Sequence, residues 1–374
     1  MSLAVVVAPT ARASEYPLWD GQETIEQYAR RANLEPTKSL DLGNGVKLET
    51  VLIPAGKFTM GTPEPTPVDE EGYRKKIVTG QVVLGLGGGA LLVLLGVVLT
   101  RAIRKRQRPQ YSLAYLVVMV LVAGVGVLGG THWWHSARLL AEAKAEYQWA
   151  LARFNDSDYW EKPAHEVTLT KPFYVGRFEV TQEQYQQVMG VNPGLFQGRD
   201  LPVEPVSWEE AEEFCKKASE VARASGSRGD PEGRPTVIRL PTEAEWEHAC
   251  RAGTRTTYNT GDTEADLDRA AWCSANSGNG SHPVGQKTPN AWGLYDIHGN
   301  VWEWCADWYR DYGPEIATDP QGPTKGRFRV LRGGSWIDDP GTCRSARRYR
   351  GDPDARNYLI DLGFRVAVMA PRTP

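Results

Sequence analysis

Two long stretches of this chain carry no charged residue, and they constrain its architecture more than any other feature. They run over residues 77–100 and 111–134, and each is 24 residues long. About 20 consecutive apolar residues suffice to cross the core of a bilayer as a helix. The glycines in both blocks suit membrane helices, where small residues allow close packing. We therefore predict two transmembrane helices; the alternative is a pair of buried core helices.

The segment between the blocks predicts their orientation. Residues 101–110 carry five positive charges, and short basic loops stay in the cytoplasm. Three positive residues at 74–76 oppose this orientation but are fewer. We expect an integral membrane protein with a cytoplasmic loop, the lipid bilayer as a partner, and its main domain outside the cytoplasm. After the second span, apolar residues at helical spacing predict a juxtamembrane helix over 135–159.

The remaining sequence predicts an irregular α+β domain. Residues 46–60 and 165–180 alternate like short strands. Capping boxes, in which a cap side chain and the third helical residue satisfy each other's backbone donors, predict three helices. They are expected over 181–189, 207–223 and 242–251, beginning at Thr181, Ser207 and Thr242. Beyond residue 252 the sequence is rich in Gly, Asn, Asp, Trp and Arg and has no long helical period. The domain should therefore be rich in coil.

Charge and cysteine content exclude several classes of function. The chain has 43 Lys and Arg against 46 Asp and Glu, which argues against a nucleic-acid partner. Five cysteines without a C-x-x-C motif do not indicate structural zinc. An odd number leaves at least one thiol unpaired within the chain. Cys305–Cys343 or Cys215–Cys250 could pair in an oxidising compartment, and the sequence does not decide between them.

Six sequence blocks, taken together, resemble one known family. They are IPAGKFTMGT, FYVGRFEVTQEQY, RLPTEAEWEHACRAGT, PNAWGLYDIHGNVWEWCADWY, RVLRGGSW and LGFRVA. Their order resembles that of the formylglycine-generating enzyme (sulfatase-modifying factor) family. The resemblance implies a coil-rich fold related to C-type lectins. It also implies a discontinuous domain over 41–68 and 160–374, preceded by an N-terminal segment 1–40. The two apolar blocks then form a hairpin inserted into one surface loop, which an even number of spans permits.

The resemblance implies a copper-dependent reaction, but this sequence has only one of the two cysteines that bind the copper. Family enzymes that convert a sulfatase cysteine to formylglycine bind Cu(I) through two cysteines, and soft ions prefer thiolates. Cys343 matches the second cysteine, but Asp338 stands in place of the first. Ser335 matches the family's active-site serine. Cys343 and Ser335 are thus the catalytic candidates, while a copper cofactor is not expected from one thiol.

A calcium ion is the cofactor that the resemblance favours. The family holds Ca²⁺ with oxygens around the segment that matches Asn290, Ala291, Gly293 and Tyr295. Oxygen ligands from a turn suit this hard cation. The alternative is an ordinary turn.

Two functions remain open at this point. The C-terminal segment also resembles the ligand-binding ends of C-type-lectin-like proteins, which implies a binding module for an extracytoplasmic protein or glycan. The implied ligand-facing residues are Trp302, Ile337, Asp338, Asp339, Arg347, Tyr349, Arg350 and Tyr358. Salt-bridge networks are the favoured explanation for the many arginines in this region. The alternative function is a copper-dependent oxidoreductase that acts on a cysteine of a target protein.

Overall fold

The domain that carries the six sequence blocks is built from two separated parts of the chain. The computed structural model describes residues 16–63, 159–225, 235–357 and 359–371. Within these ranges, no helix has both the length and the apolar character needed to cross a bilayer. The predicted spans 77–100 and 111–134, the loop between them and most of the juxtamembrane helix lie outside the described residues. The two transmembrane helices and the juxtamembrane helix therefore stay predictions.

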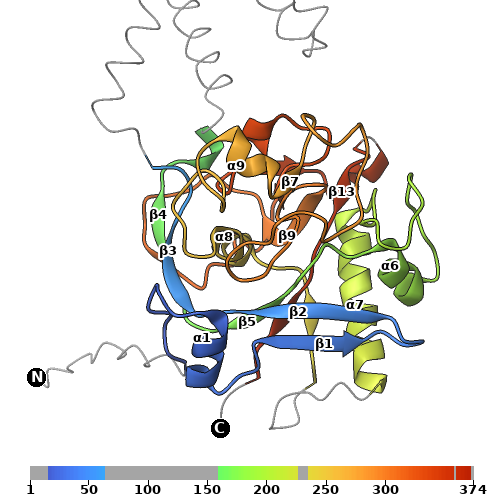
Figure 1. The fold of residues 1–374 in the computed structure, drawn as a ribbon, viewed down its shortest axis with the longest axis horizontal. Helices are drawn as coiled ribbons and strands as arrows, with labels where there is room; N and C mark the ends of the chain where they lie inside the picture. Colours follow the sequence, from blue (N-terminus) through green and yellow to red (C-terminus); the bar gives the residue numbers. More distant parts are fainter. Residues whose placement is uncertain (1–15, 64–158, 226–234, 358, 372–374) are drawn as a thin grey trace, which may run out of the picture. The chain divides into compact units, whose positions relative to one another are not determined.

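The largest sheet joins the beginning and the end of the described chain (Figure 1). Its strand order is β1-β2-β5-β14-β6, and every neighbouring pair is antiparallel. The strands are β1 (Thr37–Asp41), β2 (Lys47–Ile53), β5 (Phe173–Gly176), β14 (Ala367–Met369) and β6 (Ile238–Arg239). Helices α1 (Ile25–Ala32) and α7 (Trp208–Ala224) contact this sheet.

Smaller sheets complete the α+β fold. A three-stranded sheet has the order β10-β4-β3, from Ala317–Thr318, His165–Leu169 and Gly56–Met60. A four-stranded sheet has the order β12-β11-β9-β13, from Arg348–Gly351, Arg329–Arg332, Trp302–Trp308 and Leu362–Gly363. The short strands β7 (Ala271–Trp272) and β8 (His298–Gly299) pair in parallel. The strands predicted over 46–60 and 165–180 are thus confirmed, each divided in two.

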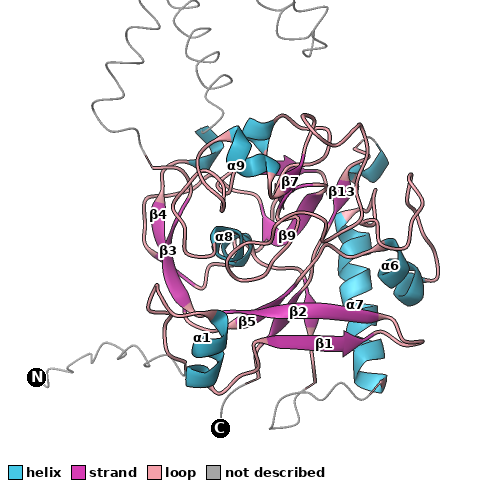
Figure 2. Ribbon diagram, viewed as in Figure 1, coloured by secondary structure: helices cyan, strands magenta, loops and turns pink. Residues whose placement is uncertain are grey.

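The three predicted capping boxes are present. Helices α6 (Gln182–Met189), α7 and α8 (Glu243–Arg251) follow Thr181, Ser207 and Thr242, whose side chains accept from the third helical residue. Two short helices that we did not predict, α1 and α9 (Glu264–Asp268), use the same device. Single 3-10 turns cover Tyr159–Glu161, Pro340–Thr342 and Ala355–Asn357. Loops otherwise dominate the chain after α8, as expected (Figure 2).

The two described ends of the inserted segment meet. Thr62 N donates to the Glu161 carbonyl at 3.0 Å, and Thr62 Oγ1 donates to Glu161 Oε2 at 2.6 Å. Gly61 has a φ of +91°, and a Cβ there would lie 2.3 Å from the Glu161 oxygen. Only glycine allows such a close approach of two backbones. This junction agrees with the predicted insertion into one surface loop.

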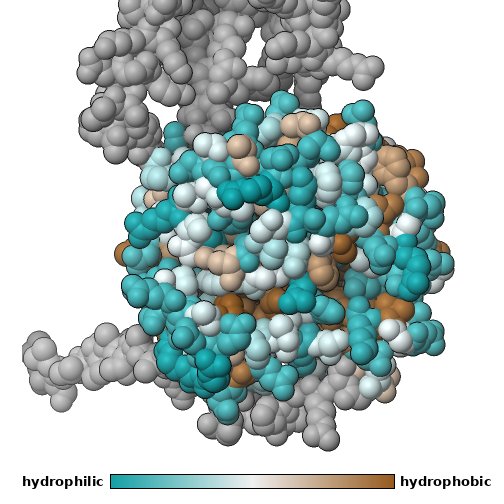
Figure 3. Space-filling view, viewed as in Figure 1, coloured by the Kyte–Doolittle hydropathy of each residue, from teal (hydrophilic) through white to brown (hydrophobic). Residues whose placement is uncertain are grey.

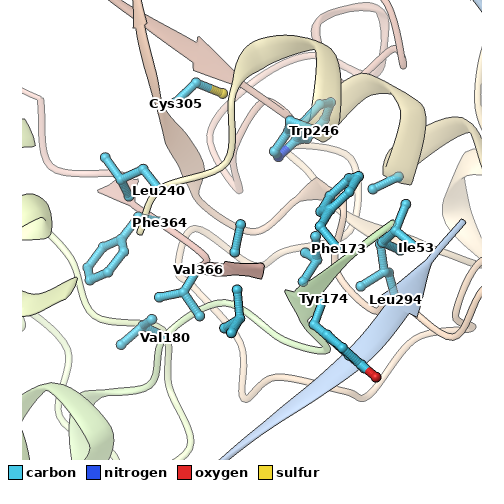
Figure 4. Close-up of a cluster of buried hydrophobic side chains, with 14 of the residues drawn as sticks. Ile53, Phe173, Tyr174, Val180, Leu240, Trp246, Leu294, Cys305, Phe364 and Val366 are labelled. Carbon is cyan, nitrogen blue, oxygen red and sulfur yellow. The ribbon is translucent and has the colours of Figure 1, made fainter. Parts of the chain in front are cut away.

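The core gathers apolar side chains from all parts of the domain. Trp246 on α8 lies near Phe173, Ile53 and Leu294, and Cys305 lies beyond it, near Leu240 (Figure 4). The visible outer face is a mixture of hydrophilic and smaller hydrophobic areas (Figure 3).

Arginines from the C-terminal segment are buried inside this core with glutamates. Arg332, Arg348 and Arg365 are at most 1% exposed and pair with Glu247, Glu243 and Glu303, respectively. The predicted salt-bridge networks therefore exist. Their acidic partners come from distant segments, rather than from the aspartates that neighbour the arginines in sequence.

Candidate functional site

The loop after β11 holds the residues that the sequence singled out. Gly333 and Gly334 follow the strand with φ of +97° and +75°. A Cβ on Gly334 would lie 2.8 Å from Cys343 Sγ, so glycine is needed for the loop to fold back on itself. Trp336 N then donates to the Asn300 carbonyl at 2.9 Å. The loop is thereby fixed against the segment that begins β9.

Ser335 lies at the centre of this loop, between two carboxyl groups. Its Oγ is 2.7 Å from Asp338 Oδ2 and 2.6 Å from Asp361 Oδ2, and its own N–H donates to Asp338 Oδ2 at 3.0 Å. A hydroxyl has only one proton to donate. Because the hydroxyl can donate to only one of the two carboxyls, we infer that the other carboxyl carries a proton and donates to Ser335. The two carboxyls then hold one proton between them.

Burial favours this shared protonation. It raises the pKa of Asp338 to about 6, and the nearby charge of Asp361 raises it further, whereas hydrogen bonds from Ser335 and Trp302 oppose the shift. The pKa of Asp361 is also raised, chiefly by burial. An isolated charge taken from water is costly, so such groups keep their protons to higher pH.

A third carboxyl, Glu204, lies beside the pair. It is fully buried, and Trp336 Nε1 donates to its Oε2 at 3.2 Å. Burial raises the pKa of Glu204 to about 7, and the charge of Asp361 adds to the effect. Sequence reasoning assigned neither Glu204 nor Asp361 to the site. The available signal for Glu204 was a single carboxyl within the otherwise uncharged run Leu201–Trp208.

The candidate thiol lies close to the Ser335 loop, because a Cβ on Gly334 would be 2.8 Å from its Sγ and the nearby charge of Asp338 helps to raise its pKa. Cys343 is fully buried in a small cluster with Tyr258, Leu267, Ala271 and Cys273. Burial raises its pKa well above the usual range, which disfavours the thiolate that copper requires. Cys305 lies in the main core instead, and all five cysteines are free. Neither pair considered from the sequence is formed, and the two matched copper positions, Asp338 and Cys343, supply one thiol where the site needs two.

The predicted ligand-facing residues fall into two groups. Ile337 and Tyr349 are 54% and 41% exposed, and the Tyr349 ring lies 5.7 Å from that of Trp302. Trp302 also hydrogen-bonds to Asp338, and Ile337 precedes Asp338 in the chain. By contrast, Arg347 pairs with Glu161 at 3.9 Å, and Arg350 lies over the rings of Trp160, Tyr309 and Phe328. Asp339 is exposed and its side chain accepts from Ser274 Oγ at 3.5 Å, whereas Tyr358 lies outside the described residues.

The predicted calcium residues form a hydrogen-bonded turn. Asn290 Oδ1 accepts from Trp292 N and Leu294 N at 3.0 and 3.1 Å, and its Nδ2 donates to the carbonyls of Ala249 and Cys250. Arg365 donates to the Tyr295 carbonyl, and Gly293 N donates to that of Asn290. Asn290 Oδ1 and the Tyr295 carbonyl, two of the oxygens expected to bind Ca²⁺, are therefore engaged in hydrogen bonds within the protein. Calcium binding stays a prediction.

Comparison with known proteins places the domain in one family. The family described as sulfatase-modifying factor enzyme 1-like domain matches residues 125–370. The chaperone protein LppX of Paenibacillus barcinonensis is 32% identical, over 54% of this chain and 81% of that protein. The formylglycine-generating enzyme of Mus musculus is 31% identical, over 54% of this chain but only 53% of its own length.

Solved structures agree with the fold. Treponema denticola variable protein 1 is 36% identical with a TM-score of 0.51, over 57% of this chain and 90% of that one. PvdO from Pseudomonas aeruginosa, 22% identical with a TM-score of 0.54, shares the fold over 90% of this chain and 99% of its own. The chain therefore belongs to the sulfatase-modifying factor enzyme 1-like domain family.

Proposed function

We propose that this protein is a membrane-anchored binding module that does not perform copper-dependent cysteine oxidation. The observation that carries the proposal is the pair of residues at the copper positions. Asp338 replaces one thiol and is bonded to Ser335, while Cys343 is fully buried among apolar side chains. A carboxylate is a poor ligand for Cu(I). Binding an extracytoplasmic protein or glycan is then the role left to the exposed residues around Asp338.

The proposed location follows from the two uncharged blocks and the basic loop between them. A hairpin returns the chain to the side from which it entered, so both parts of the domain can fold together. The junction between Thr62 and Glu161 supports this arrangement, because the chain leaves and re-enters the domain at one place.

The alternative is the oxidoreductase activity named in the mouse relative. It is favoured by the intact motifs around the site and by the 31% identity to that enzyme. Cys273, which shares the cluster of Cys343, is the thiol through which a second copper ligand could arise.

A copper titration combined with a cysteine-peptide oxidation assay separates the two functions. The test compares the wild-type chain with Asp338→Cys and Cys343→Ala, all loaded with Cu(I). We expect no turnover by the wild type. Turnover gained only in Asp338→Cys would show that one lost ligand explains the inactivity. Turnover by the wild type that Cys343→Ala abolishes would contradict the proposal, and loss in Cys273→Ala as well would identify the second ligand.

A further inference from the structure

The acidic group around Ser335 lacks a positive partner. Among the described residues, no Lys, Arg or His forms an ion pair with Asp338, Asp361 or Glu204. Nor does any positive charge lower their pKa values. This contrasts with the core, where buried carboxylates such as Glu303 are paired with arginine. Buried carboxyls without a cation are costly to the fold, so their placement calls for another explanation.

Glu204 supplies a second observation at the same place. It faces the acidic group, because Trp336 from the site loop donates to one of its oxygens and the charge of Asp361 raises its pKa. Its other oxygen, Oε1, is buried and has no hydrogen-bond partner within the described part of the chain. The Ser281 hydroxyl lies close enough to lower the pKa of Glu204, but its Oγ completes no hydrogen bond. An acceptor of this kind is costly unless something else bonds to it.

A metal ion is not the group that this arrangement suits. In the portion of the chain that the structure describes, no set of three or more His, Cys, Asp and Glu side chains could hold one. Asp338 and Asp361 meet at the Ser335 hydroxyl, and Glu204 adjoins the same loop through Trp336. An organic cation, which spreads its charge over several N–H donors, can bond to such a set of acceptors one by one.

The rim of the site indicates what carries the cation. Ile337 and Ile360 are 54% and 42% exposed, and they lie next in sequence to Asp338 and Asp361. Tyr349 is 41% exposed and adjoins Trp302, so an aromatic face is available beside the carboxyls. Aromatic faces attract cations, and exposed apolar side chains favour a ligand with its own apolar groups. A peptide segment offers both, whereas a free polyamine lacks the apolar flanks.

We propose that the Ser335 loop binds an ammonium or guanidinium side chain presented by an apolar segment of another protein. This inference rests on the proposed binding function and names its ligand class. The cation binds Asp338, the more exposed of the two carboxyls, the Tyr349 face lies beside it, and the isoleucines contact the flanking apolar groups. Because part of the attraction is electrostatic, the affinity falls as salt concentration rises.

The test uses the full chain and labelled peptides, without copper. The probes are blocked peptides with the sequence Gly-Leu-X-Leu-Gly, in which X is lysine, arginine, norleucine or glutamate. Binding is measured by fluorescence polarisation at two salt concentrations. We expect the lysine and arginine probes to bind at least about tenfold more tightly than norleucine, and glutamate not to bind.

Isosteric variants locate the binding. Asp338→Asn and Asp361→Asn keep the shape of each side chain and should each weaken the lysine probe by about tenfold or more. Glu213→Gln removes one negative charge from the exposed face of α7 and should have no effect. Circular dichroism of each variant confirms that it is folded. Equal binding of lysine and norleucine probes, no binding at all, or unchanged binding in both Asn variants would overturn the proposal.

Competition identifies other occupants. Spermidine, calcium chloride and a neutral oligosaccharide such as maltoheptaose are added to the bound lysine probe. Displacement by spermidine at the peptide's own affinity would assign the site to small amines. Displacement by calcium would assign it to a metal, and displacement by the oligosaccharide would assign it to a glycan. Each of these results would contradict a protein ligand. Copper-dependent turnover by the wild type in the oxidation assay would refute only the proposed loss of catalysis. The peptide-binding assay contains no oxidant, so its result is independent of that outcome.

Discussion

Replacing Asp338 by asparagine should make the folded domain more stable at neutral pH. Burial raises the pKa of this carboxyl from 3.8 to about 6. One pKa unit corresponds to about 1.36 kcal/mol, so ionising Asp338 costs the folded chain about 3 kcal/mol more than the unfolded chain. Asparagine is neutral and nearly isosteric, and its oxygen can still accept from Ser335. It gives up the hydrogen bond that Trp302 donates, at a cost of about 1 kcal/mol. The net gain is about 2 kcal/mol.

The gain should depend on pH with a definite sign. Since the pKa of Asp338 is raised in the folded chain, the folded wild type binds this proton more strongly than the unfolded chain does. The stability that the proton contributes is fully present only below the pKa of Asp338 in the unfolded chain. It is lost as pH rises from about 4 through about 6. The variant lacks this loss. At pH 4 it should be less stable than the wild type by about 0.5 kcal/mol, and above pH 7 more stable by about 2 kcal/mol.

Denaturant unfolding of both proteins between pH 4 and pH 8 measures this crossing, in whatever buffer or detergent keeps the full chain monodisperse. Glu213→Gln is the matched control, because it removes an exposed carboxylate of α7 and should show no crossing. A stability difference between Asp338→Asn and the wild type that stays constant with pH would refute the reasoning. If the variant is both more stable and unable to bind the lysine probe, Asp338 is retained for recognition at the expense of stability.

Three further results are expected. Arg365→Met leaves Glu303 buried without its ion-pair partner, so denaturant unfolding should show a loss of about 3–5 kcal/mol in the free energy of unfolding. Adding Glu303→Gln should restore part of that loss. Unchanged stability in Arg365→Met would contradict the network. Asn290→Ala removes the hydrogen bonds that hold its turn and should lower stability by about 2 kcal/mol or more, both in EDTA and in calcium. A loss of stability seen only in calcium would instead make Asn290 a calcium ligand. Gln107→Cys should react with an impermeant thiol reagent only after the membrane is opened, against a low background from the five buried cysteines, and labelling from outside would reverse the predicted topology.

Local signals predicted much of the fold. The capping boxes at Thr181, Ser207 and Thr242 could be recognised in the sequence because each consists of two residues three positions apart. Helix α1 has the same signal at Thr24, but it precedes the first recognised motif. The strand order, which places β14 between β5 and β6, depends on pairings across the whole chain, and no local pattern encodes it.

The site was predicted where a motif marked it and missed where distant residues meet. Ser335, Asp338 and Cys343 lie in one segment and were identified together. Asp361 reaches Ser335 from 26 positions away and Glu204 reaches Trp336 from 132, so their part in the site appears only after folding. The motif likewise could not show that the Cys343 thiol is buried beside Cys273 rather than presented to a substrate.

The junction at Thr62 and Glu161 has a consequence for how the chain is made. Strand β2 pairs with β5 and β3 with β4, yet about 100 residues separate the two halves of each pair in sequence. At a synthesis rate of about 5–20 residues per second, the first half waits about 5–20 s for its partners. During that time β2 and β3 have unpaired edges, which are prone to pair with other chains. The β1–β2 pair can form as it emerges, but the N-terminal part of the domain cannot complete its sheets, and an assisting chaperone would act on it before β4 is made.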